Sequence, residues 1–210
     1  MDVSGAVVGL VLSMPLLLPL AVYIKLMSRG PVLYTSKRVG YGDEEFTMYK
    51  FRTMEYGGDS NTHSAYMKSL IVGAADDPNG GTPAMQKMIR DPRLIPFSGL
   101  IRKTCMDEIP QFINVLLGDM SLVGPRPAIR YETDEYQEWH RSRLRVVPGM
   151  TGLWQVSGKN RLTFREMVAL DIRYSREKSF FLDLKILVLT LPAILKQIGD
   201  WLVERRTKHV

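Results

Sequence analysis

The sequence is poor in the residues that build disulfides and zinc sites. Cys105 is the single cysteine among 210 residues, so no disulfide can form within the chain, as expected in a reducing compartment. His63, His140 and His209 share no spacing typical of metal ligands, which argues against a zinc site. No histidine is near Cys105 in the sequence, so a cysteine that fills a small apolar space is favoured over a cysteine nucleophile.

Cofactor-binding and targeting motifs are also missing. Gly40-x-Gly42 lacks the third glycine of a dinucleotide fingerprint and is more typical of a hairpin turn. The stretch from Gly152 to Asn160 has one residue too many for a P-loop, and asparagine replaces the required serine or threonine. The chain has no internal repeat, no basic n-region before its first apolar run and no nucleic-acid recognition motif. We therefore expect neither a cleaved signal peptide nor a nucleic-acid partner.

Positive charge is in excess, with a formal net charge of +6. A basic protein beside a membrane has two natural partners, anionic lipid head groups and a phosphorylated substrate. A length of 210 residues allows a membrane segment and one compact domain.

The N-terminal segment Val3 to Met27 is almost wholly apolar. A straight helix of this length would reach about 37 Å, enough to cross a bilayer. Pro15 and Pro19 interrupt it, and the two arms around Pro15 are each about 18 Å long, too short for a hydrocarbon core of about 30 Å. A hairpin that dips into one leaflet is therefore an alternative to a kinked single span, which the pattern alone favours. Ser13 is the candidate partner for the carbonyls that proline leaves free.

The residues that follow this segment indicate its orientation. By the positive-inside rule, an excess of lysine and arginine marks the cytoplasmic side of a membrane segment. The basic residues that follow are Arg29, Lys37, Arg38, Lys50 and Arg52.

Two adjacent carboxylates, Asp107 and Glu108, are the strongest candidates for chemistry. They follow Arg102 and Lys103 and precede a short amphipathic segment with proline in its first turn and Gly118 as its stop. The dyad would then lie at a helix N-terminus, where ionised carboxylates are favoured and can bind Mg²⁺ or attack an electrophile. An ordinary N-terminal capping pair explains the same two residues without any chemistry.

The remaining pattern predicts an α/β fold that is mostly helical with short strands. The rigid turn Gly124 to Pro127 presents Arg126. The apolar segment 180–191 carries Asp183 and stops at Pro192, so we expect a core or interfacial helix that is too short to span. Other expected elements are strands at 31–33, 46–51 and 153–156, a loop with a short helix at 57–83, and helices at 131–145 and 163–176.

Six ordered motifs carry a resemblance that covers nearly the whole chain. The chain resembles the bacterial sugar transferase family, in the small form of the monotopic phosphoglycosyl transferases. The motifs are Ser28–Leu33, Tyr49–Met54, Met106–Gln111, Gly118–Pro127, Pro148–Gly152 and Leu182–Lys185.

This resemblance implies transfer of a sugar-1-phosphate from a UDP-sugar to polyprenyl (undecaprenyl) phosphate, with release of UMP and with Mg²⁺ as cofactor. It implies a re-entrant membrane helix, broken at Pro15, in residues 1–28. A cytosolic, membrane-associated catalytic domain with interfacial amphipathic helices would follow in residues 29–210. Met14 stands where the family usually has serine, and Ser13 lies one residue earlier. The implied location is the cytoplasmic face of the bacterial inner membrane. The implied partners are membrane lipids, downstream glycosyltransferases and a second copy of the chain.

The resemblance also implies roles for individual residues. Asp107 matches the nucleophile that would form a covalent phospho-sugar intermediate, and Glu108 would help to hold Mg²⁺ or manage protons. The matching substrate-binding positions are Lys50, Arg102, Arg126, Lys159, Asn160, Arg161 and Asp183.

Three alternatives remain open at this point. The chain could be a membrane-anchored interaction module without catalysis, or a Mg²⁺-dependent phosphohydrolase that uses the same dyad. Within the transferase hypothesis, polyprenyl phosphate could attack directly, with the dyad only holding metal.

Overall fold

The computed structural model describes residues 1–55, 67–68, 70–71 and 94–207. The loop and short helix expected at 57–83 lie outside the described residues except at four positions, and so does most of the segment 57–90, to which the sequence assigns no role.

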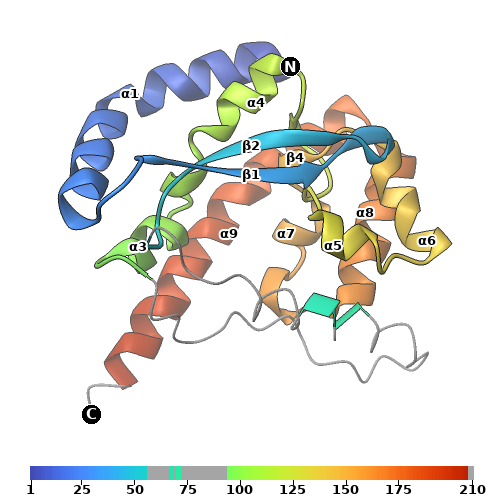
Figure 1. The fold of residues 1–210 in the computed structure, drawn as a ribbon. Coiled ribbons are helices and arrows are strands. Elements are labelled where there is room, and N and C mark those ends of the chain that lie inside the picture. Colours follow the sequence, from blue (N-terminus) through green and yellow to red (C-terminus); the bar gives the residue numbers. More distant parts are fainter. Residues whose placement is uncertain (56–66, 69, 72–93, 208–210) are drawn as a thin grey trace.

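The N-terminal apolar segment forms one helix, α1 (Asp2–Met27), with Pro15 and Pro19 inside it. Figure 1 shows that this helix bends between its two ends, so the expected break at Pro15 is a bend within a continuous helix. The hydroxyl of Ser13 donates to the carbonyl of Leu10 at 3.0 Å. Proline at position 15 frees the carbonyl of Val11 instead, because a helical N–H bonds four residues back. Ser13 therefore does not cap the carbonyl that Pro15 leaves free.

Small residues let α1 approach the rest of the molecule. A Cβ atom on Gly9 would lie 2.4 Å from the ring of Phe112, and one on Gly5 would lie 2.5 Å from the side chain of Leu122. A larger residue at either position would displace the facing side chain on α4 (Gln111–Leu117) or β3 (Ser121–Val123) or push α1 away from it. The two glycines therefore explain how α1 packs against both elements.

The hairpin β1 (Leu33–Val39) and β2 (Glu45–Phe51) pairs antiparallel around the short 3₁₀ turn η1 (Tyr41–Asp43). The turn and the second strand agree with expectation, but the strand expected at 31–33 begins only at Leu33 and continues to Val39. Proline at position 31 cannot donate a ladder hydrogen bond, which suits a place before the strand.

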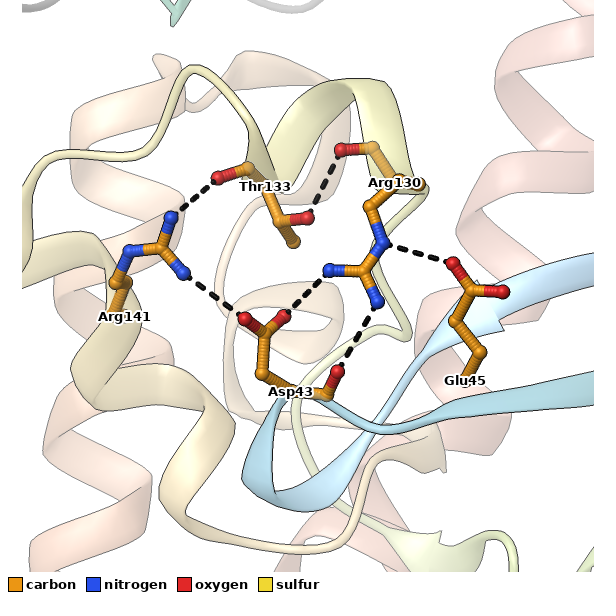
Figure 2. Close-up of polar contacts among 5 residues, drawn as sticks. All are labelled: Asp43, Glu45, Arg130, Thr133 and Arg141. Carbon is orange, nitrogen blue, oxygen red and sulfur yellow. Dashed lines mark hydrogen bonds and ion pairs between the residues drawn. The ribbon is translucent and has the colours of Figure 1, made fainter.

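The tip of this hairpin is fixed to two helices, α5 (Arg130–Thr133) and α6 (Glu138–Arg141). Figure 2 shows Arg130 bonded to the carboxylates of Asp43 and Glu45, with N–O distances of 3.1 and 2.8 Å. Arg141 approaches the other oxygen of Asp43 at 3.1 Å and also donates to the carbonyl of Thr133. A single exposed ion pair would add little, but two guanidiniums on one carboxylate fix the direction of the hairpin.

A second, parallel pair of strands follows the hairpin in the sequence. It is formed by β3 and β4 (Gly149–Thr151). A Cβ atom on Gly149 would lie 2.0 Å from the backbone nitrogen of Gly124, so only glycine permits this crossing. The residues expected as a strand at 153–156 form the helix α7 (Leu153–Val156) instead. The strand β4 ends at Thr151, and the single turn of α7 buries the side chain of Trp154 in the core.

The helices that follow differ from expectation in length. The helix expected at 131–145 is split into α5, α6 and the 3₁₀ turn η3 (Ser142–Arg145), because Gln137 is extended and caps α6. The helix expected at 163–176 is confirmed as α8 (Phe164–Glu177), with Thr163 and Glu166 forming a capping box.

The C-terminal helix α9 (Phe180–Thr207) has 28 residues and continues through Pro192, so the expectation of a short helix ending there is wrong. Pro192 lies on the exposed side of the helix, where a local bend disturbs no core packing. Among the described residues, α1 and the segment Phe180–Val203 are the two helices long and apolar enough to cross a membrane, and only 11% of each apolar window is buried.

Candidate active site

The carboxylate dyad lies in the 3₁₀ turn η2 (Met106–Glu108), between α3 (Ser98–Lys103) and α4. The dyad therefore precedes the apolar helix and is not its first turn, since Pro110 occupies the N-cap position of α4. Cys105 adopts the left-handed conformation at φ 57° directly before η2. This sharp reversal turns the chain so that Asp107 becomes buried, with 8% of its surface exposed.

Burial and the neighbouring carboxylate of Glu108 raise the pKa of Asp107 above its ordinary value. Lys50, Arg102 and a backbone hydrogen bond act in the opposite direction and favour the ionised form. The site thus confines two carboxylates and partly balances them with two cations.

Lys50 reaches the dyad from β2. Its Nζ lies 2.7 Å from Oε1 of Glu108, and both side chains are about three-quarters buried, with 24% and 30% exposed. Arg102 of α3 is near enough to Asp107 for its charge to favour the ionised carboxylate, so the predicted Lys50, Arg102, Asp107 and Glu108 lie in one region of the molecule.

Asn114 holds the strand that carries Lys50, and the sequence analysis missed it. Its amide donates to the carbonyl of Thr47 at 2.7 Å and accepts from the backbone N–H of Tyr49 at 3.0 Å. The side chain is fully buried and belongs to α4. An asparagine among the apolar residues of an amphipathic helix was the available signal, because such a polar group stays buried only when it is bonded.

Arg126 follows β3 and lies in a second cluster of charge. Its nearest carboxylate is that of Glu132, at 3.9 Å, and its backbone carbonyl accepts from Arg143 at 3.1 Å. Burial and the nearby Arg126 lower the pKa of Arg38 to about 10. The guanidinium groups of Arg38 and Arg126 lie close together with the single carboxylate of Glu132. This second cluster therefore has an excess of positive charge.

The hairpin connects the two clusters. Tyr34 of β1 pairs directly with Lys50, and Arg38 lies on the same strand face four residues further on. At about 3.3 Å per residue, this separation is about 13 Å. The sequence analysis did not assign Arg38 to a site because it ended the first strand at Leu33.

The predicted residues from the C-terminal half occupy two places. Lys159, Asn160 and Arg161 form the 3₁₀ turn η4 (Lys159–Arg161), and the Nζ of Lys159 lies 2.5 Å from Oε1 of Gln197 on α9. Asp183 lies in the first turn of α9 and accepts a hydrogen bond from the hydroxyl of Tyr174 at 2.7 Å. Burial and Asp183 raise the pKa of Tyr174. The hydrogen bond from Tyr174 to Asp183 anchors α9 to α8.

An apolar groove of about 440 Å³ opens beside the dyad. It lies between α1, the hairpin and the start of α4, and Ile109 and Pro110, which directly follow Glu108, form part of its wall. Leu17 and Ala21 of α1 and Leu33 and Phe51 of the hairpin line the other sides. A long hydrocarbon chain fits such a surface, with its polar end at the carboxylates.

The dyad suits a magnesium ion in part. The described residues contain no group of three or more histidine, cysteine, aspartate or glutamate side chains that could hold a metal. Mg²⁺ is commonly bound by one or two carboxylates together with substrate phosphates and water. Asp107 and Glu108 fit that type of site and do not fit an all-protein cage.

Sequence comparisons identify the family of the chain. Residues 1–197 match the profile of the bacterial sugar transferase family, and the chain belongs to this family. It is 40% identical over 200 residues to the galactosyl transferase CpsE of Streptococcus agalactiae serotype III (strain NEM316), covering 95% of this chain and 42% of that protein. It is 36% identical over 200 residues to the exopolysaccharide production protein ExoY of Rhizobium meliloti (strain 1021), covering 95% of this chain and 86% of that protein.

A third relative is the undecaprenyl-phosphate galactose phosphotransferase of Salmonella typhimurium (strain LT2), 36% identical over 202 residues. The match covers 95% of this chain and 40% of that protein. The chain therefore spans less than half the length of two of these three relatives and most of the length of the other.

Proposed function

We propose that this chain transfers a sugar-1-phosphate from a UDP-sugar to polyprenyl phosphate. The observation that carries the proposal is a buried Asp107 beside a Lys50-paired Glu108, at the edge of an apolar groove. Cations, carboxylates and a hydrocarbon-binding surface in one place suit two anionic substrates, one of which carries a lipid tail. The names of the relatives support the same class of reaction.

In the first step, an oxygen of the Asp107 carboxylate attacks the sugar-bearing phosphorus of the UDP-sugar. The bond from this phosphorus to the bridging oxygen breaks, and UMP leaves with that oxygen. In the second step, an oxygen of polyprenyl phosphate attacks the same phosphorus and the carboxylate leaves. The products are the lipid-linked sugar diphosphate and a regenerated Asp107, so neither step consumes an external reagent.

The chain's own cations stabilise charge during both steps. Arg102 lies beside Asp107, and Lys50 holds Glu108 in place, so negative charge that develops on the phosphate meets preorganised positive groups. Mg²⁺ held by Asp107 and Glu108 would neutralise the diphosphate when it is bound. Arg126 and Arg38 supply further positive charge along the hairpin face for the nucleotide half.

We propose that α1 enters and leaves the membrane on the cytoplasmic side. Its first residue, Asp2, accepts hydrogen bonds from the hydroxyl of Ser121 at 2.9 Å and the backbone N–H of Leu122 at 3.2 Å. After its last turn, the carbonyls of Ser28 and Arg29 accept from the guanidinium of Arg52 at 2.8 and 2.5 Å. Both ends of α1 are thus bound to the same domain, which supports a re-entrant segment over a spanning one.

We also propose that α9 lies along the membrane surface. Three polar residues of α9, spaced seven positions apart, form hydrogen bonds with the rest of the domain. Asp183 binds Tyr174, Thr190 binds Thr151, and Gln197 binds Lys159. Seven residues are close to two helical turns, so these contacts form one stripe along the helix. The opposite side carries exposed apolar residues, namely Phe181, Leu184, Val188, Leu191 and Leu195. This pattern is typical of an interfacial helix.

The test is a reaction of the detergent-solubilised protein with a UDP-sugar panel and Mg²⁺, first without lipid. The covalent route releases about one UMP per active site and then stops, and intact mass spectrometry shows a phospho-sugar adduct on Asp107. Addition of polyprenyl phosphate then restores turnover. A phosphohydrolase would release product continuously without lipid, and an interaction module would release none. Turnover with lipid but without burst or adduct would favour direct attack, with Asp107 as a metal ligand only.

A further inference from the structure

Gln197 connects two parts of the candidate site that are far apart in the sequence. It lies on α9 with 8% of its surface exposed. Its Oε1 accepts from the ammonium of Lys159 at 2.5 Å, and its Nε2 donates to the carbonyl of Lys103 at 3.3 Å. One amide therefore joins η4 to the last residue of α3, the helix that carries Arg102.

The turn that carries Lys159 does not define the direction of this side chain by itself. Lys159 has φ 46°, which is rare for a residue with a side chain, and Gly158 before it has φ 149°. A lysine on such a tight turn has four rotatable side-chain bonds and would normally point into water. The hydrogen bond to a buried amide removes that freedom.

The contact also selects the place where the ammonium is held. The carbonyl of Lys103 fixes the orientation of the Gln197 amide, because the Nε2 donor must face that carbonyl. The Oε1 acceptor then faces η4 and receives Lys159. Asp107 follows Lys103 by four residues, so the ammonium is tied to the chain segment that leads directly into the dyad.

We propose that Gln197 is a positioning residue that directs the ammonium of Lys159 toward the diphosphate of the nucleotide sugar, beside Arg102. This inference rests on the proposed function, because it assigns Lys159 to the substrate of that reaction. Gln197 itself makes no contact with substrate. Its effect is to supply a cation that is already in place when the diphosphate arrives.

The test compares Gln197→Met, Gln197→Glu and Lys159→Met in the full chain. Methionine matches the shape of glutamine without its polar atoms, so we expect KM for the UDP-sugar to rise about tenfold while kcat changes by less than about threefold. Glutamate retains the acceptor for Lys159 but loses the donor to the carbonyl of Lys103, so KM should rise less than in Gln197→Met, by about threefold. Lys196→Ala, an exposed neighbour on the same helix, is the matched control and should change neither constant.

A double variant separates positioning from general damage. If Gln197 acts through Lys159, then Gln197→Met adds no further loss to Lys159→Met, because residues that act as one unit are not additive. Independent, multiplied losses would overturn the inference, and so would an unchanged KM in Gln197→Met.

Binding of UDP to each detergent-solubilised variant, measured by calorimetry, gives a readout that does not depend on turnover. If the wild type turns over but Gln197→Met binds UDP normally, the inference fails and the proposed function stands. If no UDP-sugar turns over, the proposed function fails. Weaker UDP binding by Gln197→Met would then still support the role of Gln197, and unchanged binding would overturn it.

Discussion

Asp107 is a carboxylate that the fold buries and surrounds with charge of both signs. Desolvation and Glu108 disfavour its ionised form, whereas Lys50 and Arg102 favour it. A carboxylate in this balance suits the proposed roles of binding a cation and attacking phosphorus.

At this scale we expect Asp107→Asn to retain less than about a tenth of the wild-type rate of lipid-linked sugar formation, a barrier increase of more than about 1.4 kcal/mol. Asparagine cannot supply the anionic nucleophile, and Glu108→Gln should cause a similar loss because it removes the charge paired with Lys50. The assay is product formation with a radiolabelled UDP-sugar.

The matched controls are Asp134→Asn and Glu138→Gln, which make the same chemical changes at exposed positions. Both controls should keep near-wild-type rates, and thermal unfolding should show that all four variants fold. Retention of more than about a tenth of the rate by Asp107→Asn would refute its role as nucleophile.

At the scale of elements, the ends of α1 are the decisive feature. A helix of 26 residues is long enough to cross a membrane, yet Asp2 and the Ser28–Arg29 carbonyls are bound to one domain. Pro15 and Pro19 supply the bend that lets both ends return to it. The apolar groove that this bent helix forms with the hairpin lies directly beside the dyad.

The prediction for α1 concerns the side of the membrane on which it begins. In a Cys105→Ser background, Ser4→Cys should react with a membrane-impermeant thiol reagent only after the cells are permeabilised. Ser4 is exposed and lies outside the contact between Asp2 and β3. Pro15→Ala restores the missing helical hydrogen bond and should increase the fraction labelled in intact cells.

A cysteine at Lys37, which is exposed on β1, provides the reference for the cytoplasmic side. Labelling of Ser4→Cys in intact cells, with Lys37→Cys protected, would establish a spanning α1 and refute the re-entrant proposal.

At the scale of the whole molecule, two long apolar helices frame one basic domain. Hydropathy and length alone would allow α9 to span, but its stripe of Asp183, Thr190 and Gln197 is bound to the domain over 14 residues. About 21 Å of helix is therefore held against the domain, at 1.5 Å per residue, and is unavailable for crossing. In the proposed placement, the candidate active site would lie at the level of a lipid-borne substrate.

This arrangement predicts that both ends of α9 lie on the same side of the membrane. In proteoliposomes with the domain facing outward, Asp200→Cys and Lys37→Cys should be modified by an impermeant reagent at similar rates. Both positions are exposed. Protection of Asp200→Cys until detergent is added would show that α9 spans and would contradict the interfacial placement.

The sequence alone determined the features that depend on neighbouring residues. Motif order identified the family, and the pattern at 163–176 predicted α8. The two prolines predicted an interruption of the N-terminal helix, and α1 is bent but continuous. Local rules failed at 153–156 and at Pro192, because burial of Trp154 and the contacts of α9 with the domain outweighed local propensity.

Tertiary structure alone decided which distant groups meet. The pairing of Lys50 with Glu108, the buried Asn114 that holds β2, and the approach of Arg38 to Arg126 all join residues from separate elements. The same holds for Gln197, which joins Lys159 to α3 across the molecule. The physical reason for these contacts is packing, because a polar group is buried only where the fold brings it a partner. No local sequence pattern encodes where in the chain that partner lies.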